Sequence, residues 1–189
     1  MLLKKISFSI AAVLLLTGCG GAVKVAPTPS ATPSSANPIP KLVIPTDCLK
    51  AGMNEALSQI VPEAKYIPTK WQPAPGTELA NFLDNGGLAC SYGLQSAEVG
   101  ITAKWVDDSK GLFENRIAGW VAEGYVKTEL PDTKGAEAYF LLKKQSPTQE
   151  FHVWSLNVKY HQTWLQLNCT AFAQTLDAGL PLFKAMISQ

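Results

Sequence analysis

The chain has 189 residues, 47% of them hydrophobic, and a formal net charge of +1 at pH 7. Arg116 is its only arginine, whereas proteins that bind nucleic acids or other polyanions need clustered cations. We therefore exclude nucleic acid as a partner. The length leaves room for one domain with a substantial core.

The first residues have the pattern of an export signal. Lys4 and Lys5 precede an apolar run over residues 6–16, which is shorter than the roughly 20 residues that a transmembrane helix needs. It therefore predicts a signal peptide over residues 1–18. The run ends at Leu16–Cys19 with the sequence LTGC, which resembles the lipobox of bacterial lipoproteins. The resemblance implies cleavage before Cys19 and a diacylglyceryl group on its thiol.

A lipidated Cys19 would place the protein at the extracytoplasmic face of the cell membrane. Each buried methylene contributes about 0.8 kcal/mol, so two acyl chains anchor a protein where one does not. Loss of Lys4 and Lys5 would change the formal charge from +1 to −1. The alternative is an ordinary signal peptide that ends near Ala22, in which Cys19 has no special role.

A linker over residues 19–40 follows, without apolar periodicity. It is rich in small polar residues and has prolines at positions 27, 29, 33, 38 and 40. Such a segment cannot bury enough apolar surface to offset its ordering entropy. We expect a spacer between the membrane and a single domain at residues 41–189.

The domain is expected to begin with a helix over residues 46–61, which Pro62 ends. Residues 63–87 are rich in proline and glycine, and only a helical turn near residues 79–83 is expected there. Alternating apolar residues then predict strands at 88–94 and 99–105, joined by a turn at Gln95-Ser96.

A second helix is expected after Asp107-Asp108-Ser109, with an inner apolar stripe of Leu112, Phe113, Ile117, Trp120 and Val121. Three or four further strands are expected, at 124–130, 136–144, 151–160 and 163–169. A last helix is expected from about Ala171, with Phe172 on its apolar stripe, and Gly179 and Pro181 should break or kink it.

Short connections between strands favour antiparallel pairing. The predicted fold is therefore α+β, an antiparallel β-sheet of about five or six strands with packed helices, in an α/β/α-type sandwich. This order of elements resembles the Mog1/PsbP-like sandwich. It also resembles small cell-envelope lipoproteins of actinobacteria, in which one cysteine at the first helix precedes another on the first strand, the positions of Cys48 and Cys90 here. The resemblance implies an accessory or binding module.

Three cysteines remain in the domain, namely Cys48, Cys90 and Cys169. Export would place them in an oxidising compartment, where a disulfide is plausible. Three thiols allow one bridge. We favour Cys48–Cys90, which would tie the first helix to the sheet, and the pairs 90–169 and 48–169 remain open. No CxxC occurs, so we expect no metal site, and no cofactor is expected.

His152 and His161 are the only histidines. An envelope hydrolase or metal-dependent enzyme that uses one of them is the alternative function, although no catalytic set is recognised around either. A structural subunit of an envelope complex is a further alternative.

The aromatic residues predict a binding surface instead. Trp71 lies in the irregular 63–87 segment, and Trp154, Tyr160 and Trp164 lie on or beside the predicted strands at 151–169. A tryptophan over a sheet could wall a groove for an apolar small molecule or an envelope protein. The simpler interpretation is that Trp71 closes the edge of the core. The function we expect is a membrane-anchored, non-enzymatic ligand- or protein-binding module.

Overall fold

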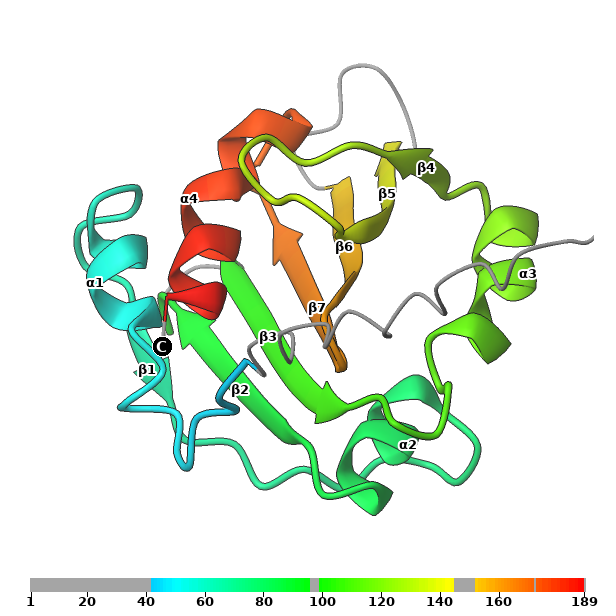
Figure 1. Cartoon of the computed structure of the whole chain (residues 1–189). Coiled ribbons are helices and arrows are strands. Elements are labelled where there is room, and N and C mark those ends of the chain that lie inside the picture. The colour runs from blue at the N-terminus through cyan, green and yellow to red at the C-terminus, as the bar shows by residue number, and fades with distance from the viewer. Residues whose placement is uncertain (1–41, 96–98, 145–151, 172, 189) are drawn as a thin grey trace, which may run out of the picture. The chain divides into compact units, whose positions relative to one another are not determined.

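The computed structural model describes residues 42–95, 99–144, 152–171 and 173–188, which lie within one compact unit. The lipobox, Cys19 and the linker are outside them. The described residues form seven strands and four helices (Figure 1). In chain order these are α1 (Met53–Ser58), β1 (Lys65–Ile67), α2 (Glu78–Asp84), β2 (Leu88–Gly93), β3 (Gly100–Asp107), α3 (Glu114–Glu123), β4 (Val126–Thr128), β5 (Glu137–Lys144), β6 (His152–Tyr160), β7 (Thr163–Thr170) and α4 (Leu176–Ile187).

All seven strands belong to one open antiparallel sheet with the order β1-β2-β3-β7-β6-β5-β4. The α+β class and the antiparallel sheet are thus confirmed, with one strand more than the upper expectation. The extra strand is β1, which pairs with β2 over three residues only. Its backbone N–H at Tyr66 is also bound by the Asn54 side chain at 2.7 Å. The segment 63–87 around it is rich in proline and glycine, and no side-chain period there predicted a strand.

The two faces of the sheet have different cores. On the first face, α1 and α4 lie next to each other and cover the apolar side chains of the central strands (Figure 1). On the second face, α2 and α3 contribute to a smaller, mainly aromatic cluster of Phe82, Val106, Phe113, Trp120, Tyr139 and Trp164. Helices therefore pack on both faces.

The first predicted helix is wrong in its first half, because residues 46–52 form turns. The carboxylate of Asp47 accepts the backbone N–H groups of Leu49 and Lys50 at 3.0 Å each. Gly52 then has a φ of 61° immediately before α1, a left-handed conformation that glycine adopts readily. Cys48 thus lies in a turn and not on a helix.

Two further boundaries differ from the prediction. The second predicted helix, α3, begins at Glu114, because Asp107 ends β3 and Asp108 accepts the backbone N–H of Phe113 at 3.0 Å. Val121 is 57% exposed and so does not belong to its inner stripe. The segment 63–87 contains β1 and a full helix α2, which Thr77 caps by accepting the N–H of Ala80.

The last helix, α4, runs from Leu176 to Ile187 without the predicted break at Gly179 or Pro181. Thr175 caps it by accepting the backbone N–H of Ala178 at 3.3 Å. Phe172, Phe151 and Ser96, which carried parts of the predictions, lie outside the described residues. All six predicted strands are present, as β2 to β7, with ends shifted by a few residues.

Candidate functional site

Helices cover the second face of the sheet only in part. Beyond the aromatic cluster under α2 and α3, an open hollow of about 330 Å³ lies on the sheet beside β1. This volume is at the lower end of the roughly 300–1,000 Å³ of small-molecule sites. We call it the sheet hollow. It is lined by Ile67, Thr69, Ser91, Tyr92, Gly100, Ile101, Thr102, Asn168 and Thr170.

The centre of the sheet hollow is a row of three polar residues on neighbouring strands. Ser91 on β2 lies opposite Thr102 on β3, which lies opposite Asn168 on β7. Residues directly opposite each other in a sheet point to the same face. All three are half-buried. Among the described residues, the hydroxyls of Ser91 and Thr102 have no hydrogen-bond partner.

Asn168 joins the sheet hollow to a buried polar network. Its Oδ1 accepts a hydrogen bond from Ser155 Oγ at 2.6 Å, and its Nδ2 donates to Gln166 Oε1 at 3.2 Å. Gln166 Nε2 donates in turn to Glu78 Oε2 at 2.6 Å and to Asn157 Oδ1 at 2.8 Å. The hydrogen bonds with Ser155 and Gln166 therefore fix the orientation of the Asn168 amide.

Glu78, in the first turn of α2, is the hub of this network. Its Oε1 accepts from Arg116 Nε at 2.9 Å and from Trp120 Nε1 at 2.6 Å, and an Arg116 Nη2 atom lies 2.9 Å from the same oxygen. One carboxylate thus connects α2, α3 and, through Gln166, β7. The network holds both helices on the second face.

Replacing Glu78 by Gln should destabilise the domain by about 1–3 kcal/mol, because it leaves donors on Arg116, Trp120 and Gln166 competing for one neutral acceptor. Urea unfolding followed by circular dichroism measures the change. The matched control is Glu63→Gln at an exposed position, for which we expect a change within about 0.5 kcal/mol. Equal effects of the two substitutions would contradict the role of Glu78 as the hub.

Lys104 on β3 is 7% exposed and donates a hydrogen bond to Gln166 Oε1. Burial lowers the pKa of its side chain below the ordinary 10.5, and the charge of Glu78 acts in the opposite direction. Between the lowered pKa and 10.5, the unfolded chain holds a proton that the folded protein has lost. Stability contributed by Lys104 should therefore rise with pH in that window.

The variant Lys104→Met tests this pH dependence. We expect the free energy of unfolding of the wild type to rise relative to that of Lys104→Met as the pH approaches 10.5. Urea unfolding of both proteins over a series of alkaline pH values measures the difference. Lys134→Met, at an exposed position, is the control for the loss of a surface lysine. A difference that does not change with pH would disprove the expected effect of burial.

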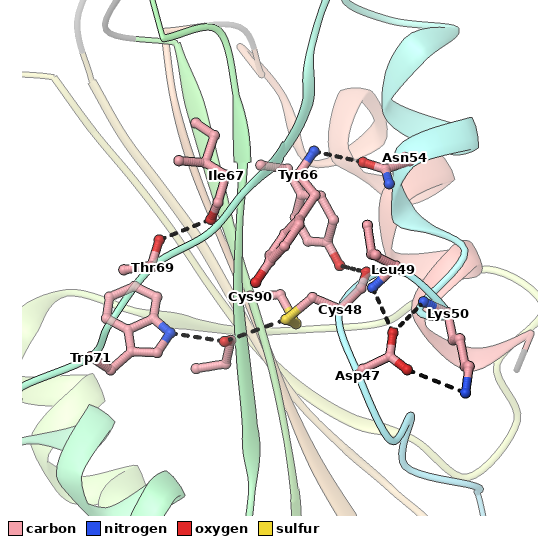
Figure 2. The surroundings of a disulfide bond; sticks show 12 residues. Asp47, Cys48, Leu49, Lys50, Asn54, Tyr66, Ile67, Thr69, Trp71 and Cys90 are labelled. Carbon is pink, nitrogen blue, oxygen red and sulfur yellow. Dashed lines mark hydrogen bonds and ion pairs between the residues drawn. A yellow bond between two sulfur atoms is a disulfide. The ribbon is translucent and has the colours of Figure 1, made fainter.

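The disulfide Cys48–Cys90 is the second candidate feature (Figure 2). Its Cα atoms are 5.5 Å apart, and Cys169 is a buried free cysteine, so the pairing favoured above is the one present. Tyr92 donates its hydroxyl to the backbone oxygen of Cys48 at 2.8 Å. Cys48 Sγ lies 3.7 Å from the backbone oxygen of Ala89, and this is not a hydrogen bond, because a disulfide sulfur carries no proton.

Trp71 lies at the edge of β2 beyond the short strand β1. Its Nε1 donates to the backbone oxygen of Ala89 at 2.8 Å, in the place where a longer β1 would have donated. Figure 2 shows Ile67, Thr69 and Trp71 following one another along β2, on the side opposite Cys48. The half-buried indole therefore closes the sheet edge, and it stands two residues beyond Thr69, which lines the sheet hollow.

The other aromatic residues of the predicted surface are not brought together. Trp154 is fully buried on the first face, where it packs against Phe140 and donates Nε1 to Thr175 O at 2.8 Å. Trp164 is fully buried on the second face. Tyr160 is half-buried beside the first core. Of the four, only Trp71 lies near the sheet hollow.

The two histidines lie at opposite ends of β6. His152 begins the strand, is 5% exposed and contacts the backbone oxygen of Ala173 through Nε2. His161 follows the strand in the turn to β7, with a φ of 56°, and its ring packs on Tyr160. They cannot act on one substrate. In the part of the chain that the structure describes, no group of three or more His, Cys, Asp or Glu side chains could hold a metal ion.

Sequence reasoning did not predict the row of Ser91, Thr102 and Asn168. Alternation assigns Ser91 and Thr102 to a face opposite their apolar neighbours. It does not show that β3 pairs with β7, which brings Asn168 beside Thr102. The signal that was available is that each of three predicted strands carries an uncharged hydroxyl or amide group at a polar position, although Lys104 occupies the next polar position after Thr102.

The comparisons with known proteins add no relative. The chain matches no protein-family model, no curated protein and no solved structure. The resemblances to lipoproteins and to the Mog1/PsbP-like sandwich therefore stay predictions. Within the described ranges, no helix is long and apolar enough to cross a membrane.

Proposed function

We propose that this chain is a lipoprotein, anchored through acyl chains on Cys19 at the extracytoplasmic face of the cell membrane, whose domain is a non-enzymatic binding module. Its ligand would bind in the sheet hollow beside residues 67–69. The observation that carries the binding role is this hollow of about 330 Å³, left open on a sheet whose other face is covered by α1 and α4.

Two separate parts of the chain support the location. The lipobox at Leu16–Cys19 is the pattern of a lipidated, exported protein. The domain independently carries the Cys48–Cys90 disulfide, and disulfides persist mainly in oxidising compartments outside the cytoplasm. In a reducing cytosol the two thiols would stay unbonded, and the bridge would not stabilise the fold.

The lining of the sheet hollow changes the kind of ligand that we propose. An apolar small molecule was expected from the tryptophans, but Trp154 and Trp164 are buried in the two cores. The lining of the sheet hollow has more apolar than polar surface, but the side chains of Ser91, Thr102, Asn168 and Thr170 place polar groups in it. We therefore propose a ligand that carries polar groups as well as an apolar surface. The enzyme alternative that uses His152 or His161 receives no support from their positions at opposite ends of β6.

Anchoring is tested by expressing the full chain in a bacterial host with a clickable palmitate analogue. We expect label on the wild type in the membrane fraction, and none on the Cys19→Ala variant. An unlabelled wild type that is released into the medium would refute the anchor.

Binding is tested by native mass spectrometry of the full chain extracted gently in detergent. We expect an added mass on the wild type that is absent from Thr102→Trp, a substitution that fills the sheet hollow. Thr128→Trp on the edge strand β4 is the control for a new surface tryptophan and should keep the added mass. An added mass that survives in Thr102→Trp would place the ligand elsewhere.

A further inference from the structure

We infer that the sheet hollow takes an uncharged, hydroxyl-bearing ligand, a neutral saccharide, and that Ser91 and Thr102 recognise it. The inference rests on the proposed binding role and specifies its ligand class. It follows from three properties of the hollow, namely the absence of charge in its lining, two hydroxyls without partners, and apolar side chains along one border.

The lining residues of the sheet hollow carry no charged side chain. A charged group that enters a site without a counter-charge loses hydration that nothing replaces. The charged groups of the nearby network do not line the hollow: Glu78 and Arg116 pair with each other between α2 and α3, and Lys104 is buried and donates to Gln166. The hollow therefore favours a neutral ligand over an anion or a cation.

Ser91 and Thr102 supply hydrogen bonds of the kind that a sugar makes. A hydroxyl group can donate one hydrogen bond and accept two, and the two hydroxyls lie on directly opposite residues of β2 and β3. Neither is used within the described part of the protein. In the open hollow these half-buried hydroxyls are accessible to water, and a ligand hydroxyl can replace that water with hydrogen bonds of the same kind.

Asn168 extends the same row. Each of its amide atoms makes one hydrogen bond within the network, so Nδ2 keeps a second N–H and Oδ1 keeps a second lone pair. Because Ser155 and Gln166 fix the amide orientation, these free positions are presented in a defined direction. Three neighbouring strands thus offer neutral donors and acceptors side by side, as recognition of several ligand hydroxyls requires.

The border of the sheet hollow at β1 is partly apolar. Ile67 lines it directly, and Trp71 stands two residues beyond Thr69 on the same side of β2 (Figure 2). A saccharide ring has an apolar C–H surface as well as hydroxyls. A hollow with hydroxyls in its floor and an aliphatic side chain on its border matches both. A small polar ion has no apolar surface to pack against Ile67.

Three sugars with the same ring and different charge separate the ligand classes. The full chain, in a detergent without a sugar headgroup, is titrated with glucose, glucosamine or glucuronate, and backbone amide shifts are followed by NMR. We expect saturable shifts at Ser91, Thr102 and Asn168 with glucose, and clearly weaker binding of the two charged analogues. Stronger binding of glucosamine or glucuronate would overturn the neutral class, and no saturable shift with any of the three would overturn the saccharide assignment.

Substitutions in the row test recognition. Ser91→Ala and Thr102→Val should each weaken glucose binding roughly threefold to tenfold, as expected for one lost hydrogen bond. Thr128→Val, on another strand and also half-buried, should leave binding unchanged. Unchanged binding in both row variants would overturn the role of these hydroxyls. An added mass in native mass spectrometry that disappears in Thr102→Trp, together with no glucose shift, would reject the ligand class while leaving the binding role intact.

Discussion

Removal of the Cys48–Cys90 disulfide should lower the free energy of unfolding by about 4 kcal/mol. The bridge joins residues 42 positions apart, and the chain-entropy model gives this value for a closed loop of that size. The loop contains α1, β1 and α2, so the unfolded chain gains freedom over a large part of the domain. The measurement is urea unfolding of the double variant Cys48→Ala and Cys90→Ala against the oxidised wild type.

The control for this prediction is the remaining cysteine. Cys169 is 2% exposed, and burial raises the pKa of its thiol, so it should stay protonated and unreactive in the folded protein. In reducing agent, the wild type should unfold at the same urea concentration as the double variant. Cys169→Ala keeps the bridge, so reduction should lower its free energy of unfolding as it does for the wild type. A double variant as stable as the oxidised wild type would show that the bridge does not constrain the unfolded chain.

Gly179→Ala should destabilise the protein by about 3 kcal/mol, although alanine is normally the better helix former. A Cβ atom on Gly179 would lie 2.2 Å from Cζ2 and 2.4 Å from Cη2 of Trp154. The indole cannot yield easily, because it is fully buried and donates Nε1 to Thr175 O at 2.8 Å. Overpacking of this kind typically costs about 1–3 kcal/mol, occasionally more. Thermal and urea unfolding measure the change.

Gly119→Ala in α3 is the matched control. There a Cβ atom would meet the Arg116 guanidinium at 3.6 Å, an ordinary contact, so the helix propensity of alanine should dominate and stabilise the protein by about 0.5–1 kcal/mol. The two substitutions are chemically identical and should have opposite signs. The same sign at both positions would show that Trp154 can move away from α4, and that Gly179 is not required for packing.

The strands were predictable where a side-chain period was visible. Residues 99–105 alternate between apolar and polar side chains, and β3 occupies that segment with Ala103 and Trp105 fully buried. The period is a local property, because neighbouring side chains point to opposite faces whatever the strand pairs with. The α+β class and the antiparallel sheet followed from these periods and from the short connections between strands.

Two of the departures, the extra strand and the unbroken last helix, depend on contacts between residues far apart in the chain. β1 exists because it pairs with β2 and because Asn54 binds Tyr66 N. The continuation of α4 through Pro181 has a similar cause, since Leu182, Phe183 and Met186 are buried in the first core. Proline removes one hydrogen bond from the helix interior, and the packing of these three side chains outweighs that loss.

In the candidate site, too, local sequence predicted some features, and contacts between distant residues decided the others. Residue type suggested that Trp154 and Trp164 could form a surface, but a tryptophan serves a core equally well, and only the packing of α4 and of α2 with α3 decides that both are buried. The export pattern at Leu16–Cys19 and the polarity of Ser91, Thr102 and Asn168 can be seen in the sequence. That these three residues form one row depends on the pairing of β3 with β7 across more than sixty residues, because hydrogen bonds between distant strands, and not local propensity, set the strand order.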